Sequence, residues 1–213
     1  MTTTQDIDLH LIRTKLAPPR IGSAPVIRDE LLTQLDAQRA CRLSLVLGPA
    51  GCGKTTLLTQ WRRTLLLKGS RVAWYNVGAD DDDVHVAAYL VESLHQAGID
   101  IDRTALQLFA RSGGKVWKPL LASLINDLGR SADDVYLVVD DFHYLRSFGL
   151  LRLVDQWIAL APERFHLVLG SRMRPPLDLG ALRVAGQLTE LAFGDLRFGL
   201  DETQRFVASQ GLA

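Results

Sequence analysis

The sequence predicts an α/β fold in which a parallel sheet of five strands is covered by helices on both faces. Three observations lead to this prediction. Short apolar segments alternate along the chain with longer helical segments, which is the order that parallel sheets require. Glycine follows several helical segments at the position where helices often end. The 213 residues, 47% of them hydrophobic, can bury a substantial core.

An arm and one short helix are expected before the first strand, over residues 1–40. Pro18 and Pro19 favour extended backbone in the residues that precede them, so we expect the arm to be extended through Arg20. Within residues 28–40, three leucines have the spacing of one face of a helix.

Strands and helices then alternate over residues 41–192, which are expected to form the core domain. The expected strands are short, mostly apolar runs at residues 42–47, 71–77, 135–139, 165–169 and 187–191. The expected helices occupy residues 54–68, 84–97, 117–128 and 151–160. Gly69 and Gly98 suit the left-handed position that ends the first two helices. Trp61, Trp74 and Trp157 lie on apolar faces and are expected in the core.

Four consecutive aspartates, at positions 80–83, precede the second of these helices. They lack the alternating spacing of a calcium-binding loop. Because negative side chains complement the amino end of a helix, we interpret the run as a helix cap.

The last segment, residues 193–213, is expected to begin a helical lid. Residues 201–210 have a helical pattern, and Asp201 is the expected N-cap. The chain stops without a closing element, so we expect it to be a fragment of a larger protein.

The composition argues against several classes of protein. Lysine plus arginine and aspartate plus glutamate both total 24, and a net charge of zero argues against non-specific nucleic-acid binding by the whole chain. No apolar stretch reaches the roughly 18 residues of a membrane span, and the amino terminus has no secretory signal pattern. Cys41 and Cys52 are the two cysteines and imply no disulfide framework. A cytoplasmic location is therefore expected.

Residues 48–55, GPAGCGKT, match the phosphate-loop pattern G-x-x-x-x-G-K-[ST] and lie between an apolar strand and a leucine-rich helix. Gly51 and Gly53 allow positive φ, so successive N–H groups can converge on an anion at the amino end of the helix. Lys54, taken as an exposed loop lysine, is expected to reach the β- and γ-phosphates, and the Thr55 hydroxyl to hold Mg²⁺. The residues expected to bind the nucleotide here are Gly48, Pro49, Ala50, Gly51, Cys52, Gly53, Lys54, Thr55 and Thr56.

A second apolar run, YLVVDD, ends in Asp140 and Asp141, the acids expected beside the phosphate loop. Asp140 is expected to bind Mg²⁺ together with Thr55, partly through water. Asp141 is expected to orient or deprotonate the attacking water. The alternative for each is a strand-end acid that caps the next turn. His143 is interpreted as a loop histidine that makes a local hydrogen bond, with a nucleotide contact as the alternative.

A third apolar strand, at residues 165–169, is followed closely by Arg172. In a P-loop sheet with an additional strand, this strand lies between those that carry the phosphate loop and the paired acids. Arg172 would then sense or stabilise the charge of the γ-phosphate as a catalytic group. The alternative is a surface arginine in the loop that leads to Pro175 and Pro176.

Eight segments in this order form a specific set: LIRTKLAPPR, VIRDELL, LVLGPAGCGKTTL, RVAWYNV, AAYLVESL, YLVVDDFH, LVLGSR and LRVAGQLTEL. Together they resemble the N-terminal nucleotide-binding domain of MalT-type LuxR-family transcriptional activators, which belong to the signal-transduction ATPases called STAND. The resemblance implies an α/β P-loop NTPase fold of the additional-strand, STAND/AAA-like type.

The resemblance also implies roles for residues and partners. Val26, Ile27 and Arg28 match the segment that packs on the adenine, and Arg172 matches the sensor arginine. Such proteins hold ADP at rest and ATP when an inducer binds a distant sensor domain. Their ATP form self-associates and activates transcription through a C-terminal helix-turn-helix.

From this resemblance we expect the chain to bind ATP or ADP with Mg²⁺. Since the sensor and DNA-reading domains of such proteins are missing from it, we expect no inducer or DNA binding. Because the lid is cut short, we expect slow or no hydrolysis and only a weak ATP/ADP switch.

Two other functions remain open. A metabolic P-loop kinase would need an acceptor pocket and lid arginines, for which Arg172 and Arg174 are the candidates. A structural or oligomerisation module with a vestigial phosphate loop would gain no stability from ATP and Mg²⁺.

Overall fold

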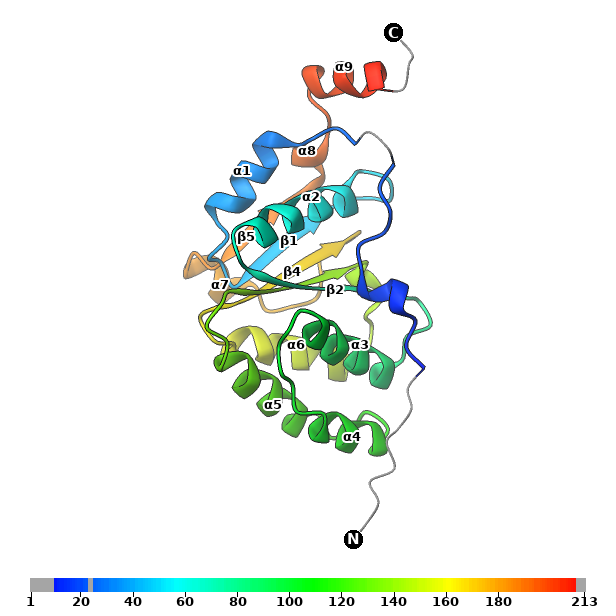
Figure 1. Ribbon diagram of the computed structural model, residues 1–213, viewed down its shortest axis with the longest axis vertical. Helices are drawn as coiled ribbons and strands as arrows, with labels where there is room; N and C mark the ends of the chain where they lie inside the picture. Colours follow the sequence, from blue (N-terminus) through cyan, green and yellow to red (C-terminus); the bar gives the residue numbers. More distant parts are fainter. Residues whose placement is uncertain (1–9, 23–24, 210–213) are drawn as a thin grey trace.

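A five-stranded sheet with four parallel strand pairs forms the centre of the computed structural model, which describes residues 10–22 and 25–209 (Figure 1). The strand order is β2-β3-β4-β1-β5. The strands are β1 Leu43–Leu47, β2 Arg71–Asn76, β3 Val135–Asp140, β4 Phe165–Ser171 and β5 Leu188–Leu191. Thus β4 lies between β1 and β3, as predicted for an additional-strand P-loop sheet, and the carboxyl ends of these three strands are neighbours.

Nine α-helices and two short 3-10 helices connect and flank the strands within the described residues. The α-helices are α1 Asp29–Ala37, α2 Lys54–Leu67, α3 Asp83–Gln96, α4 Thr104–Arg111, α5 Lys118–Gly129, α6 Phe148–Leu160, α7 Gly180–Val184, α8 Phe193–Leu196 and α9 Leu200–Ser209. The 3-10 helices are η1 Arg13–Leu16 and η2 Phe142–Tyr144.

Helices cover both faces of the sheet, as predicted (Figure 1). On one face α1 and α2 pack with Trp61 and Trp74 in a core cluster that also includes Leu196 of α8. On the other face α3, α5 and α6 form a larger cluster around Trp157. The three tryptophans are 1–2% exposed, which confirms that they belong to the core.

The helices expected from periodicity are present, but five short elements were not expected: η1, α4, η2, α7 and α8. Each has eight residues or fewer, which is too short for a clear periodic pattern or for stability without packing. In α4, for example, the anchor is Phe109, which is 1% exposed.

The arm departs from a fully extended chain because side chains of β2, of α3 and of the loop between them hold it. The Lys15 ammonium lies 2.5 Å from Asp81 Oδ1, and the Ile12 N–H donates to the Tyr89 hydroxyl at 3.1 Å. Asn76 Nδ2 donates to the carbonyl oxygens of Lys15 and Ala17. These contacts stabilise the turn of η1, and the extended geometry before Pro18 is kept at Ala17.

The last helix begins one residue before the expected N-cap. Asp201 is the second residue of α9 rather than its N-cap, because Leu200 is already helical. Glu202 takes a capping role instead, since its Oε2 accepts the Gly199 N–H at 3.0 Å. Gln210, the expected end of this helix, lies outside the described residues.

None of the helices in residues 10–22 and 25–209 combines the length and the apolar character needed to cross a membrane.

The aspartate run caps α3, as predicted. Asp82 is the N-cap, and its Oδ1 accepts the His85 N–H at 2.8 Å. That hydrogen bond is the main reason why the pKa of Asp82 is lowered. A carboxyl group with a lowered folded-state pKa stabilises the fold above its ordinary pKa and loses this contribution as the pH falls through the lowered value.

We predict that Asp82→Ala destabilises the protein at neutral pH by about 1 kcal/mol, the usual cost of losing an N-cap. In thermal unfolding this corresponds to a decrease in Tm of about 2–4 °C for a chain of this size. The difference should shrink in acid as the carboxylate is protonated. Asp80→Ala, which removes an exposed neighbouring acid, is the control. Equal decreases for both variants would contradict the cap.

Candidate functional site

The carboxyl ends of β3, β4 and β1 bring the three predicted parts of the site to one edge of the sheet. The phosphate loop follows β1, Asp140 ends β3, and Arg172 follows β4. A hydrogen bond of 3.1 Å from the Gly48 N–H to the Ser171 carbonyl joins the first residue of the loop to the end of β4. Ligands of open α/β sheets bind at this edge.

The phosphate loop has the backbone that its glycines allow. Gly51 and Gly53 have φ values of 78° and 87°, a region that other residues rarely adopt. Helix α2 begins at Lys54, directly after Gly53. The free N–H groups and the positive end of this helix therefore lie at the loop, where they favour an anion.

Glycine is required at position 48 because neighbouring side chains leave no space for a Cβ atom. A Cβ atom at this position would lie 2.7 Å from Cys52 Sγ and 3.3 Å from Leu196 Cδ1 of α8. Helix α8 thus packs against the start of the phosphate loop.

Lys54 is buried rather than exposed, contrary to expectation, with 6% of its surface accessible. Its ammonium donates hydrogen bonds to the Gly48 carbonyl at 2.8 Å and to the Pro49 carbonyl at 2.9 Å. The Cys52 sulfur lies 3.9 Å from the same nitrogen. The lysine therefore holds the loop in this structure with two of its three N–H groups, and phosphate oxygens would take the third or exchange with a carbonyl when a nucleotide binds.

Asp140 and the phosphate loop are joined by a short hydrogen bond. The Thr55 hydroxyl donates to Asp140 Oδ2 at 2.5 Å, and the Asp141 N–H donates to Asp140 Oδ1 at 2.9 Å. Asp140 is 2% exposed, and this burial raises the pKa of its carboxyl group. A cation near these oxygens would stabilise the ionised form.

The oxygen atoms of Thr55 and Asp140 suit Mg²⁺, which prefers oxygen ligands and usually takes only one or two from the protein. Within the described parts of the chain, no three His, Cys, Asp or Glu side chains are grouped so that they could hold a metal ion. A magnesium ion here would therefore depend on Thr55, Asp140, phosphate oxygens and water.

Asp141 is the one non-glycine residue with positive φ in the described chain, at 54°. Aspartate tolerates this conformation better than most residues, and such backbone is concentrated at functional sites. Its side chain is 42% exposed, so its carboxylate has access to solvent at the edge of the sheet.

His143 does not make the predicted local hydrogen bond. Neither of its ring nitrogens has a hydrogen-bond partner among residues 10–22 and 25–209, and Nδ1 lies 3.8 Å from Asp141 Oδ1. Burial lowers the pKa of the ring, which favours the neutral imidazole.

The two arginines after β4 differ in their surroundings. Arg172 is exposed, and its guanidinium carbon lies 6.0 Å from the centre of the Tyr144 ring. Arg174 instead forms an ion pair with Glu190, which leaves it less suited to serve a kinase lid.

The three residues expected beside the adenine lie in different surroundings. Val26 is buried, and its carbonyl accepts a hydrogen bond from Gln60 Nε2 at 2.9 Å. Ile27 is 54% exposed. Arg28 is 4% exposed, and its guanidinium binds α8 and the start of α9.

Two residues of the site were missed in the sequence. Gln60 of α2 fixes the backbone of Val26 and Arg28, and no local pattern marks it. Gly170 lies inside β4, where a Cβ atom would overlap Asp140 Oδ1. A glycine inside an apolar strand is a known signal of close approach and could have pointed to this position.

The fold and the phosphate loop define a P-loop NTPase domain. Residues 37–169 match the AAA domain family, and the chain belongs to that family. The chain is also 32% identical over 197 residues to the HTH-type transcriptional regulator MalT of Yersinia enterocolitica, which confirms the resemblance to MalT-type proteins. This alignment covers 92% of the chain but 21% of the length of that relative.

Solved structures show the same fold. The Signal Transduction ATPase with Numerous Domains (STAND) protein with a tetratricopeptide repeat sensor from Pyrococcus horikoshii matches with a TM-score of 0.59 and 18% identity, over 91% of this chain and 26% of that one. The Aeropyrum pernix ORC1 protein in complex with DNA matches with a TM-score of 0.52 and 18% identity, over 86% and 47% of the two chains. At these identities the likeness shows the fold alone.

We predict that Gly170→Ala displaces the Asp140 carboxylate, because the added methyl group needs the space of Oδ1. The crowding should destabilise the fold by about 1–3 kcal/mol. It should also weaken Mg²⁺-dependent binding of ATP, measured by calorimetry. Gly22→Ala is the control, since no atom of the described residues, its chain neighbours aside, lies within 4 Å of a Cβ atom there. Unchanged affinity in Gly170→Ala would contradict the proposed importance of this carboxylate position.

Proposed function

We propose that this chain is a nucleotide-binding regulatory domain that binds ATP or ADP with Mg²⁺ at the carboxyl edge of its sheet. The observation that carries the proposal is the contact between the phosphate loop and the buried acid of β3, a hydrogen bond of 2.5 Å between Thr55 and Asp140. Membership of the AAA domain family and the identity to MalT support the same class of function.

The phosphate loop would bind the triphosphate through main-chain N–H groups and Lys54. The loop residues that we assign to nucleotide binding are Gly48, Pro49, Ala50, Gly51, Cys52, Gly53, Lys54, Thr55 and Thr56. Lys54 would donate to phosphate oxygens, which form strong, charge-assisted hydrogen bonds. Val26 and Ile27 would pack on the adenine.

Thr55 and Asp140 would hold Mg²⁺, which neutralises charge on the phosphates when bound. Asp141 would orient or deprotonate the attacking water, and Arg172 would stabilise the charge of the γ-phosphate. Hydrolysis in this chain would be slow or absent.

The regulatory role follows from a difference in affinity. A nucleotide shifts a conformational equilibrium only as far as it binds the two states differently. The relative MalT is a transcriptional regulator, and the chain spans 21% of its length. We propose that the nucleotide state of this domain controls self-association and a DNA-binding part that lies outside these 213 residues. The chain itself would not bind DNA.

We predict that Lys54→Ala lowers the affinity for ATP at least tenfold, because a charge-assisted contact with the phosphates is lost. It should also destabilise the free protein, since the buried ammonium binds two loop carbonyls. Calorimetric titration with ATP and Mg²⁺ measures the first effect, and thermal unfolding measures the second.

Lys68→Ala is the matched control. This lysine follows the other end of α2 and forms an ion pair with Asp36 at the surface. Its removal should leave ATP affinity unchanged. Retained affinity in Lys54→Ala, within a few-fold of the original chain, would contradict the assignment.

We predict that Asp140→Asn removes most of the effect of Mg²⁺ on ATP affinity, because the amide lacks the charge that attracts the cation. Titrations with and without Mg²⁺ measure this effect. Asp141→Asn is the comparison: it should keep the Mg²⁺ effect and reduce any hydrolysis. If ATP binds the original chain equally well with and without Mg²⁺, the proposed metal site is wrong.

A further inference from the structure

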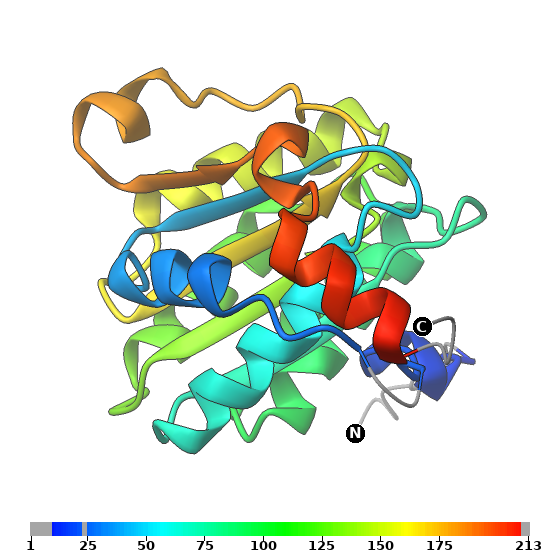
Figure 2. The ribbon, with the colours of Figure 1, turned by 90° about the horizontal axis from the view of Figure 1, so that it is seen from above.

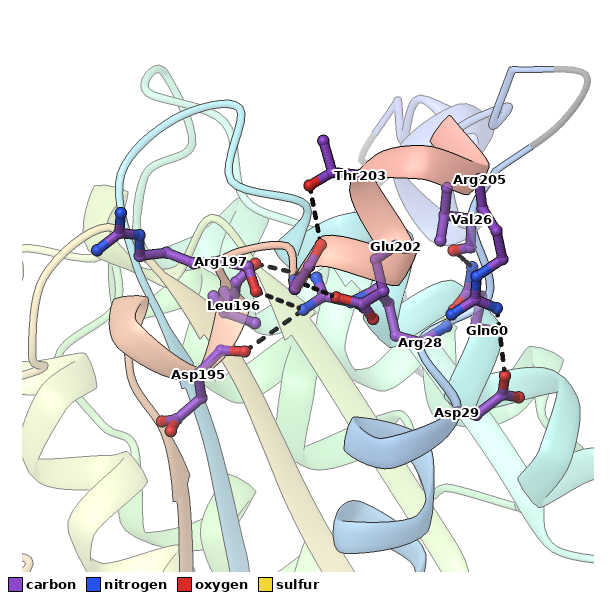
Figure 3. A network of polar contacts seen from close by, with 11 residues as sticks. Val26, Arg28, Asp29, Gln60, Asp195, Leu196, Arg197, Glu202, Thr203 and Arg205 are labelled. Atoms are coloured by element: carbon purple, nitrogen blue, oxygen red, sulfur yellow. Dashed lines mark hydrogen bonds and ion pairs between the residues drawn. The ribbon is translucent and has the colours of Figure 1, made fainter. Parts of the chain in front are cut away.

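The guanidinium of Arg28 joins the segment before α1 to α8 and α9, two consecutive helices about 170 residues further along the chain (Figure 3). Its Nε donates to Glu202 Oε1 of α9 at 2.7 Å. Its Nη1 donates to the Leu196 carbonyl at 2.9 Å, and its Nη2 to the carbonyls of Asp195 and Arg197 at 3.4 and 3.2 Å. Most of the donors that an arginine has are therefore used in one place.

The three carbonyls lie at the carboxyl end of α8, where a helix leaves acceptors without partners inside the helix. A buried arginine suits this position, because its planar group donates in several directions at once. The Arg28 guanidinium carbon also lies 5.0 Å from the centre of the Phe198 ring, just after α8. Arg28 thus fixes the turn between α8 and α9.

The carboxylate of Glu202 neutralises the charge of the Arg28 guanidinium. Its side chain is 17% exposed and that of Arg28 is 5% exposed, so both charges are largely removed from water. A buried charge that loses its partner is costly. A second ion pair between the same segments, Arg205 with Asp29 at 3.6 Å, is exposed and is expected to contribute little.

The backbone of Arg28 contacts α2, the helix that follows the phosphate loop. Its N–H donates to Gln60 Oε1 at 3.2 Å, and Gln60 belongs to α2, the helix that begins at the phosphate loop. Helix α8, which Arg28 caps, packs against Gly48. From above, α9 lies beside the segment that precedes α1 (Figure 2). One residue therefore connects the phosphate-loop helix, the loop itself through α8, and α9.

We infer that Arg28 and Glu202 form a latch that positions α9 over the Val26–Arg28 segment and links the position of this helix to the nucleotide site. Arg28 is then a positioning residue whose side chain serves α8 and α9 rather than the adenine. The coupling part of this inference rests on the proposed function; the latch itself does not.

The latch is tested first without nucleotide, by amide hydrogen exchange of α9. Glu202→Gln keeps an oxygen that can cap Gly199 but removes the charge that pairs with Arg28. We expect the α9 amides to exchange about tenfold faster in this variant, as for loss of a charged hydrogen bond. Amides of β1, β3 and β4 should be unchanged, which also shows that the variant is folded.

Asp201→Asn is the matched control, because it removes the same charge from the same helical turn without touching Arg28 in the structure. It should leave α9 exchange within about twofold of the original chain, as expected for a loss of helix-dipole interaction alone. Equal acceleration in Asp201→Asn and Glu202→Gln, or none in either, would overturn the latch.

Arg28→Lys supplies a second, independent variant. If the two side chains act as a pair, Glu202→Gln should have much less effect on α9 exchange in the Arg28→Lys background than alone. Full additivity of the two substitutions would overturn the pairing even if each one loosens α9.

The coupling is tested by adding ATP and Mg²⁺. Binding should slow α9 exchange in the original chain, because a helix position that favours ATP is in turn favoured by ATP. Glu202→Gln should reduce this protection and weaken ATP binding. ATP binding that leaves α9 exchange unchanged would refute the coupling. Failure of the original chain to bind ATP would refute the proposed function and, with it, the coupling, while the nucleotide-free result would still decide the latch.

Discussion

The hydrogen bond between the Thr55 hydroxyl and the Asp140 carboxylate is the contact on which the candidate site depends. It joins the amino end of α2 to the end of β3, across the intervening strand β4. The strand order makes this contact possible, and Gly170 of β4 leaves the space for it. Without this arrangement the phosphate loop and the buried acid would be two separate features, and neither alone would favour a nucleotide bound with a metal ion.

Most of the sheet could be predicted from the sequence, because each strand is a short apolar run and glycines mark the ends of several of the helices between them. The position of β4 between β1 and β3 was expected for a P-loop sheet with an additional strand and is confirmed. The short elements could not be predicted, since packing rather than local preference stabilises them. The turn of η1, for instance, depends on Asp81 and Tyr89, more than sixty residues further along the chain.

The sequence predicts which residues form the site better than it predicts what their side chains contact. The motif identifies Lys54 and Thr55, but it does not say that the lysine is buried against its own loop in this structure. The resemblance singles out Arg28 within Val26–Arg28. The partners of its side chain on α8 and α9 lie about 170 residues away, and no sequence pattern marks them. Long-range contacts of this kind depend on the whole fold, which local sequence patterns do not encode.

The most direct test of the central claim is an NMR titration of the chain with ADP and Mg²⁺, followed through the backbone amides. The amide signals of Gly51, Gly53 and Thr55 should shift together and saturate, while those of residues 133–135, at the opposite edge of the sheet, should stay in place. Signals of the phosphate loop that remain unchanged at saturating nucleotide, or shifts confined to another surface, would contradict the central claim.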